Sequence, residues 1–199
     1  MTDRLTRQLA FLTEVDQMKS VLRQSPLMDK SRRENDAEHS WHIALMALTL
    51  QEYAAADNVD IERVMKMALV HDLVEIYAGD TFAYDTVGYE DKLTREQASA
   101  DRVFGLLPPD LGAEYRALWE EFDRMETPDA MYASAIDRFQ PFFINTKTDG
   151  YTWVRHGGIL VSQVYQRMEP VKTAIPALWE YVEQGIRDAV EKGYLHPDQ

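Results

Sequence analysis

Residues 67–74 read MALVHDLV, an apolar run that is interrupted only by the adjacent pair His71-Asp72. Asp137 interrupts a second apolar stretch in the same way, and His39 precedes a third. Because an unpaired charge is costly to bury, buried carboxylates are normally paired with a cation or bound to a metal ion. No cationic partner is obvious for these two, so the pattern indicates that the four residues form one metal site.

The four residues form no compact local motif, so the packing of three helices must assemble the site. Adjacent helical residues point about 100° apart. His71 and Asp72 therefore reach one ion only if it lies over the ridge between them, which leaves its other sides to His39 and Asp137. Two imidazoles and two carboxylates suit one divalent ion, such as Mn, Co, Fe, Zn, Ni or Mg. An octahedral ion keeps positions for water and for a substrate oxygen, as hydrolysis requires.

Apolar residues recur every three or four positions along most of the chain, which predicts an all-α fold. Asn35 and Glu38 have the spacing of a capping box, Asp60 is a candidate N-cap, and Gly79 is a candidate helix end. The expected helices cover approximately residues 5–20, 36–56, 61–78, 94–106, 111–124, 128–146, 157–169 and 175–192.

The segments between these helices carry three further expectations. Residues 80–92 have few periodic apolar positions and are expected to form a long loop near the site. Pro141 should bend the helix that carries Asp137, and residues 151–154 are the only short strand candidate. With 199 residues and no repeat or linker, the chain suits one domain spanning residues 1–199.

Composition excludes several classes of protein. The chain has no cysteine, which rules out disulfides, thiolate nucleophiles and iron–sulfur clusters. A net charge of −13 argues against binding to polymeric nucleic acid. The N-terminus resembles no signal peptide, and no stretch approaches the roughly 18 apolar residues of a membrane span. A cytoplasmic protein without a membrane partner is expected.

Residues 19–33 form a basic segment in this acidic chain, just before His39. A solvated basic turn is one interpretation of the segment, but its position favours binding of a small phosphorylated ligand. Arg23, Arg32 and Arg33 are therefore candidate phosphate ligands, because a guanidinium can bind phosphate through two hydrogen bonds. Lys30 and Arg138 are further basic candidates. His42 lies three residues after His39, and it is either a substrate-binding group or a core histidine.

Together with Asp137, the segments RENDAEHS (residues 33–40) and HDLVEIYAGD (residues 71–80) resemble the signature of HD-domain metal-dependent phosphohydrolases. Within that family they resemble the branch that contains the bacterial 5′-deoxynucleotidases. The resemblance covers roughly residues 20–145 and implies an all-helical HD-type bundle, one divalent metal ion and phosphomonoester hydrolysis. The chain departs from that branch before residues 26–28, where Gln24-Ser25 replace an Arg-Trp pair and Arg23 lies one position earlier.

The resemblance also assigns two catalytic residues. It implies that Glu75 acts on the attacking water and that Asp80 lies in the site. Glu75 follows His71 by one helical turn, so its carboxylate can take or orient a proton of that water; the alternative is an exposed helical glutamate. Asp80 follows the predicted helix end and has two interpretations, a group that fixes water or sugar and a cap of the next loop.

These observations lead to one hypothesis with alternatives. The chain is expected to hydrolyse a small phosphomonoester, a (deoxy)nucleoside 5′-monophosphate above all, with one metal ion bound by His39, His71, Asp72 and Asp137. A cyclic or pyrophosphorylated nucleotide is an alternative substrate, and a non-catalytic, nucleotide-binding regulatory protein is an alternative class. The C-terminal helices, about residues 157–192, should pack on the core, and a homodimer or higher oligomer is possible.

Overall fold

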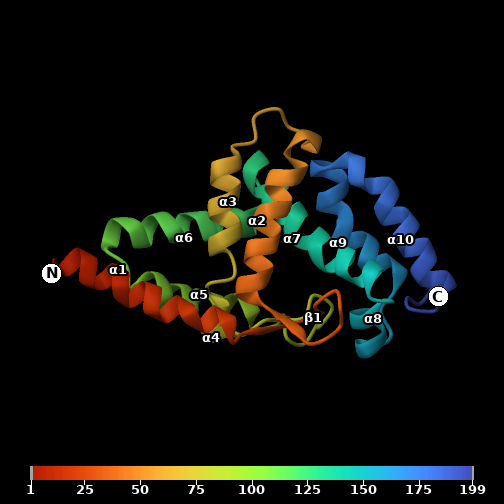
Figure 1. The fold of residues 1–199 in the computed structure, drawn as a ribbon, viewed down its shortest axis with the longest axis horizontal. Coiled ribbons are helices and arrows are strands. Elements are labelled where there is room, and N and C mark those ends of the chain that lie inside the picture. The colour runs from red at the N-terminus through yellow and green to blue at the C-terminus, as the bar shows by residue number, and fades with distance from the viewer. Residues whose placement is uncertain (1, 199) are drawn as a thin grey trace.

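The computed structural model describes residues 2–198 and shows a helical molecule with one small sheet (Figure 1). Helices α2 and α3 lie at its middle, α1, α5 and α6 extend to the N-terminal end, and α8, α9 and α10 form the C-terminal end. In chain order the elements are α1 (Asp3–Glu14), η1 (Val15–Lys19), β1 (Leu22–Pro26), β2 (Arg33–Asn35), α2 (Asp36–Leu50), η2 (Gln51–Tyr53), α3 (Ile61–Val70), α4 (Glu75–Ala78), α5 (Lys92–Phe104), α6 (Pro109–Arg124), α7 (Pro128–Lys147), α8 (Tyr151–His156), α9 (Val161–Ala174), η3 (Pro176–Leu178) and α10 (Trp179–Glu191).

The predicted helix ends are largely confirmed. Asn35 accepts a hydrogen bond from the Glu38 backbone and the Glu38 side chain returns one, which completes the capping box of α2. Asp60 caps α3 through two backbone N–H groups. Gly79 ends α4 with φ +76°, a backbone conformation that other residues rarely adopt. Pro141 lies inside α7, and the bend expected there stays a prediction.

Four sequence-based predictions of local structure were wrong. The expected helix over residues 36–56 ends as an α-helix at Leu50. Residues 151–154 belong to α8 and form no strand, because the Trp153 ring packs into the core with its centroid 5.7 Å from that of Phe142. The only sheet among residues 2–198 pairs β1 with β2 antiparallel, in a segment expected to be a loop. Strand β1 lacks the apolar alternation that signals a strand, so backbone pairing defines it.

The fourth correction concerns the helix expected over residues 61–78. It breaks after Val70, residues 71–74 form a turn, and α4 begins at Glu75. The Val74 carbonyl accepts from the Ala78 backbone N–H, and the Ser99 hydroxyl also donates to it, which ties α5 to this turn. The break therefore places His71 at the C-terminus of α3 instead of in the middle of a helix.

Helix α7 lies at the centre of the molecule and packs against α2, α3, α6 and α9. Most of its residues are buried, including Tyr132, Ile136 and Phe139. A second apolar cluster, around Phe11, Val74 and Phe104, joins α1 and α5 to the turn after α3. The buried polar positions of the next section lie where these packed helices meet.

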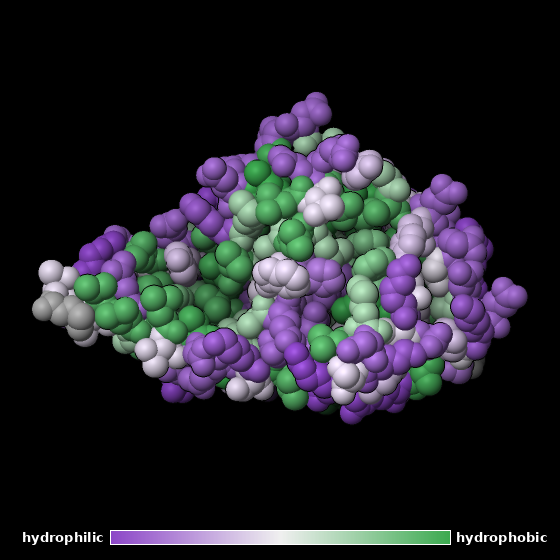
Figure 2. Space-filling model, viewed as in Figure 1, coloured by the Kyte–Doolittle hydropathy of each residue, from purple (hydrophilic) through white to green (hydrophobic). Residues whose placement is uncertain are grey.

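Several large apolar side chains remain exposed on α1 and α2. Figure 2 shows apolar residues gathered on the face of the molecule that carries these helices. The exposed residues there include Leu5, Leu9 and Leu12 of α1 and Trp41 and Leu45 of α2. Among the described residues, no helix is both long and apolar enough to cross a membrane.

Candidate metal centre

The four predicted metal ligands meet in one place, although three separate elements supply them. His39 comes from the first turn of α2, Asp137 from α7, and His71 and Asp72 from the turn after α3. The Nε2 atom of His39 lies 3.0 Å from Asp137 Oδ1 and 3.7 Å from Asp72 Oδ2. The Nε2 atom of His71 lies 3.1 Å from Asp72 Oδ2 and 3.7 Å from Asp137 Oδ1. We call these four residues the ligand quartet.

Both imidazole rings are oriented to offer Nε2 to a metal ion. The Nδ1 atom of His39 lies 3.2 Å from the Gln140 side-chain oxygen, and Nδ1 of His71 lies 3.0 Å from the Ala68 carbonyl oxygen. Both oxygens are acceptors, so Nδ1 of each ring donates to them and Nε2 is the atom that faces the carboxylates. Nε2 of His71 is buried and has no hydrogen-bond partner. Two inward-facing imidazole nitrogens beside two carboxylates fit a divalent ion.

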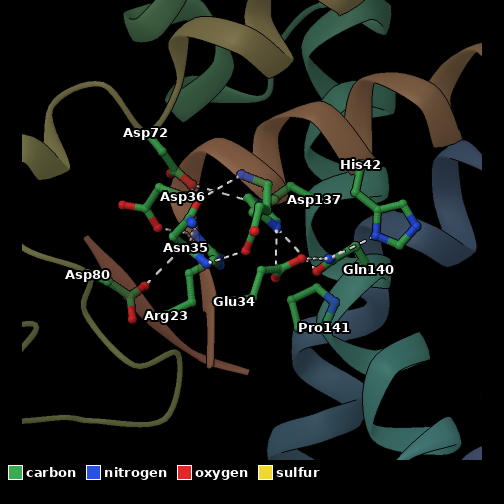
Figure 3. Close-up of polar contacts among 12 residues, drawn as sticks. Arg23, Glu34, Asn35, Asp36, His42, Asp72, Asp80, Asp137, Gln140 and Pro141 are labelled. Atoms are coloured by element: carbon green, nitrogen blue, oxygen red, sulfur yellow. Dashed lines mark hydrogen bonds and ion pairs between the residues drawn. The ribbon is translucent and has the colours of Figure 1, made fainter. Parts of the chain in front are cut away.

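A chain of hydrogen bonds holds His39 through its Nδ1 atom, the ring nitrogen that faces away from Asp137. The Gln140 amide nitrogen donates to Glu34 at 2.8 Å and lies 3.2 Å from Nδ1 of His42. Gln140 is fully buried, and Figure 3 shows it between Glu34 and His42, on the His42 side of Asp137. The geometry therefore links His42 to the quartet through Gln140, not through direct contact with the metal position.

The electrostatics of the quartet favour a cation among its carboxylates. Burial opposes the charge on His71, but Asp72 and Asp137 outweigh it and raise its pKa to about 10. Burial and the charge of Arg23 lower the pKa of His39 to about 4. Burial would raise the pKa of both aspartates, yet the adjacent imidazoles and, at Asp72, Arg23 hold it well below the usual range. The acids are therefore ionised and ready to bind metal.

Arg23 lies at the centre of a second group of carboxylates beside the quartet (Figure 3). Its Nη1 atom is 2.7 Å from Asp72 Oδ2, 3.4 Å from Asp36 Oδ1 and 3.9 Å from Asp80 Oδ1. Glu75 is buried close by, and its pKa is raised well above the ordinary value by burial and by the charges of Asp72 and Asp36. Arg23 thus compensates the negative charge of these buried carboxylates. It lies at the site, as predicted, but it contacts the candidate metal ligand Asp72.

A cavity of about 230 Å³ opens beside the quartet. It is lined by His71, Asp72 and Asp137, by Glu75, and by the basic residues Lys92, Arg138 and Arg167. Lys92 is paired with Glu96 at 2.8 Å. The cavity therefore brings together three candidate metal ligands, a buried glutamate and basic side chains, which are the kinds of group needed to bind and attack a phosphate ester.

The structure places the other predicted phosphate ligands away from this cavity. Arg32 is half exposed and pairs with Glu38. Arg33 donates to backbone carbonyls of Leu22 and Arg23, so it holds the β1–β2 hairpin. Neither arginine lines the cavity, and a role for them in substrate binding stays a prediction.

Sequence reasoning missed several residues of the site. Gln140 accepts a hydrogen bond from His39, one of the candidate metal ligands. It carries no charge, so the only signal in the sequence was its position three residues, about one helical turn, after Asp137. Arg138 was predicted only as a further basic candidate for phosphate binding, and the structure places it at the cavity. Lys92 and Arg167 belong to α5 and α9, outside any motif, and only tertiary packing brings them to the cavity.

Comparisons with known proteins agree with this geometry. A family model described as "HD domain" matches residues 15–179. The chain is similar in structure to a predicted metal-dependent phosphohydrolase from Magnetospirillum magnetotacticum MS-1, with a TM-score of 0.91 and 49% sequence identity. That match covers 98% of this chain and 96% of the other.

Two vertebrate relatives are similar in sequence, and both are named 5′-deoxynucleotidase HDDC2. The Danio rerio protein is 34% identical over 133 residues, which is 66% of this chain and 64% of the relative. The Homo sapiens protein is 31% identical over 131 residues, 65% of this chain and 62% of the relative. The chain thus spans less than two thirds of the length of these relatives.

Proposed function

The chain belongs to the HD domain family, and from that premise we propose that it is a metal-dependent phosphohydrolase acting on nucleoside 5′-monophosphates, deoxynucleotides among them. One observation carries the proposal. The ligand quartet has both Nε2 atoms turned toward its carboxylates, and three of its members line a 230 Å³ cavity that also holds Glu75 and three basic side chains. The names of the relatives support the substrate class.

His39, His71, Asp72 and Asp137 would hold the ion. A divalent ion bound there stabilises negative charge on the phosphate and acidifies water. Glu75 supplies the base: it is 6% exposed, and its Oε2 atom is buried without a hydrogen-bond partner in the described chain. Its carboxylate accepts the proton that the water loses as it attacks phosphorus.

Asp80 is proposed to orient substrate or water at the edge of the site. Its Oδ1 atom faces Arg23 at 3.9 Å, while Oδ2 has no partner among the described residues. Arg23 keeps Asp72 ionised and in place through a 2.7 Å contact. The neighbouring carboxylates therefore stay in one arrangement while the substrate binds.

The test is phosphate release from a panel of ribo- and deoxynucleoside monophosphates, with chelator-treated protein and each divalent ion added back. We expect release that depends on the ion. Asp72→Ala should lose both metal content and turnover. Glu75→Gln should keep one equivalent of metal and lose rate by about 10²–10⁴-fold, the usual contribution of a general base. Binding of metal and nucleotide without release by the wild type would contradict the proposal and favour a regulatory protein.

We also propose that the protein forms a homo-oligomer. The exposed leucines of α1 and the exposed Trp41 of α2 support this proposal, because apolar patches of this kind mark association surfaces. Light scattering on the purified chain measures the state directly, and a monomer at all concentrations would contradict it.

A further inference from the structure

Two arginines from different helices lie together at the cavity, and the function described above gives neither of them a role of its own. Arg138 follows the metal ligand Asp137 on α7, and Arg167 comes from α9. Both line the 230 Å³ cavity, and both also line a neighbouring cavity of about 430 Å³. We propose that this arginine pair is an anion subsite that binds the phosphate oxygens of a monoester dianion and selects it over a diester.

The guanidinium groups of the pair have few partners within the described chain. Arg138 donates its one side-chain hydrogen bond to the sulfur of Met125, at 3.2 Å, which is a weak acceptor. No carboxylate of residues 2–198 lies within ion-pair distance of it. Arg167 approaches Asp137 Oδ2 at 3.8 Å, beyond hydrogen-bond range. Other arginines of this protein, such as Arg63, form full ion pairs.

Such an arrangement is costly without an anion. Half-buried guanidinium groups lose hydration, and two like charges side by side repel each other. The carboxylate of Asp137 offsets part of this cost, but in the proposed function that group binds the metal ion. An anion between the arginines supplies the missing acceptors, and each planar guanidinium can give it two parallel hydrogen bonds.

The geometry also sets the charge of the preferred ligand. A monoester dianion has three non-bridging oxygens, so one can face the quartet while two remain for Arg138 and Arg167. A diester has two non-bridging oxygens and a single negative charge, so it leaves one guanidinium without a partner. Because an unpaired buried donor is penalised, the arginine pair disfavours diesters, including cyclic nucleotides. This inference deepens the proposed function and rests on it for the identity of the monoester.

The test compares Arg138→Met and Arg167→Met with wild type and with the control Arg187→Met, which removes an exposed arginine on α10. The first readout is binding of inorganic phosphate to the metal-loaded protein by calorimetry. We expect each variant to bind phosphate about ten- to a hundredfold more weakly, the loss of one charge-assisted hydrogen-bonding group. Metal content and thermal unfolding should stay at wild-type levels. Arg167→Lys should recover part of the affinity, because it restores the charge but not the planar fork.

The second readout is the ratio of kcat/KM for p-nitrophenyl phosphate to that for bis-p-nitrophenyl phosphate. The ratio should fall at least tenfold in both Met variants and stay unchanged in Arg187→Met. Unchanged phosphate affinity and an unchanged ratio in folded, metal-loaded variants would overturn the anion subsite, while leaving the proposed hydrolase intact. Conversely, arginine-dependent phosphate binding by a wild type that hydrolyses no monoester would support the subsite and remove the proposed function.

Discussion

Replacing Arg23 with methionine tests the electrostatic account of the site. The Arg23 guanidinium is 2.7 Å from Asp72 and 3.4 Å from Asp36, and its side chain is 12% exposed. Removing one partner of a buried ion pair costs about 3–5 kcal/mol, because the other charge is left without compensation. For a domain of this length each kcal/mol lowers Tm by about 2–4 °C. Chelator-treated Arg23→Met should therefore melt roughly 6–20 °C below wild type.

A bound metal ion should reverse most of this loss. The ion places positive charge against Asp72, the carboxylate that Arg23 contacts. Two unit charges 4 Å apart interact by about 4 kcal/mol at an effective dielectric constant of 20. Removing the positive charge of Arg23 therefore strengthens the binding of the metal ion to Asp72 by an amount of that order. The rise in Tm on adding Mn²⁺ should thus be larger in Arg23→Met than in wild type.

The assay is thermal unfolding with chelator and across a Mn²⁺ titration. Arg4→Met is the control, since Arg4 forms an exposed ion pair with Asp110 and its loss should leave both melting curves unchanged. If chelator-treated Arg23→Met melts within about 2 °C of wild type, less than the effect of 1 kcal/mol, the reasoning is refuted. The carboxylates around Arg23 would then be neutral and would need no counter-charge.

Three further substitutions test separate contacts. Gln140→Leu removes the acceptor for His39 Nδ1 and should weaken metal binding about 10–100-fold in a competition with a chelating dye; equal affinity would show that the ring needs no support. Tyr132→Phe leaves a buried carbonyl of α2 without its donor and should lower the free energy of unfolding by about 1–3 kcal/mol in urea, and a neutral result would contradict this. Burial opposes the charge on Lys92, but the charge of Glu96 outweighs burial and raises the pKa of Lys92 above its ordinary value of 10.5. The Lys92–Glu96 pair therefore stabilises the fold fully below pH 10.5, and this stabilisation is lost as the pH rises through the pKa of Lys92 in the folded state. Urea unfolding should show this loss in wild type and not in Lys92→Met.

The candidate metal ligands could be picked out from the sequence because each breaks a pattern. Asp72 and Asp137 are charged residues in apolar stretches, and in the structure Asp72 is buried, Asp137 is half-buried, and each has a histidine beside it. The capping box at Asn35 was equally visible, because its chemistry is local to four residues. Features whose cause lies within one or two turns of helix leave a signal in the sequence.

Features that arise from distant contacts left no such signal. The β1–β2 hairpin is held by Arg33, whose side chain donates to carbonyls of the facing strand, a contact without apolar periodicity. Beside the break after α3, Ser99 of α5 donates to the Val74 carbonyl across 25 residues of sequence. Arg167 reaches the cavity only because α9 packs along α7. Tertiary packing, not local propensity, decides each of these.

The arrangement of charge around the quartet gives the site a direction. On one side Arg23 gathers acidic residues, with Glu75 buried among them. On the other side Asp137 is followed by Arg138 and approached by Arg167. Under the proposed function we therefore expect a phosphate monoester to bind with its charged oxygens toward the arginines and with the phosphorus open to attack from the side of Glu75. The arginines hold the charged oxygens, and the acidic residues around Arg23 offer the dianion no favourable contact on the side from which water approaches, which keeps the path of the nucleophile open.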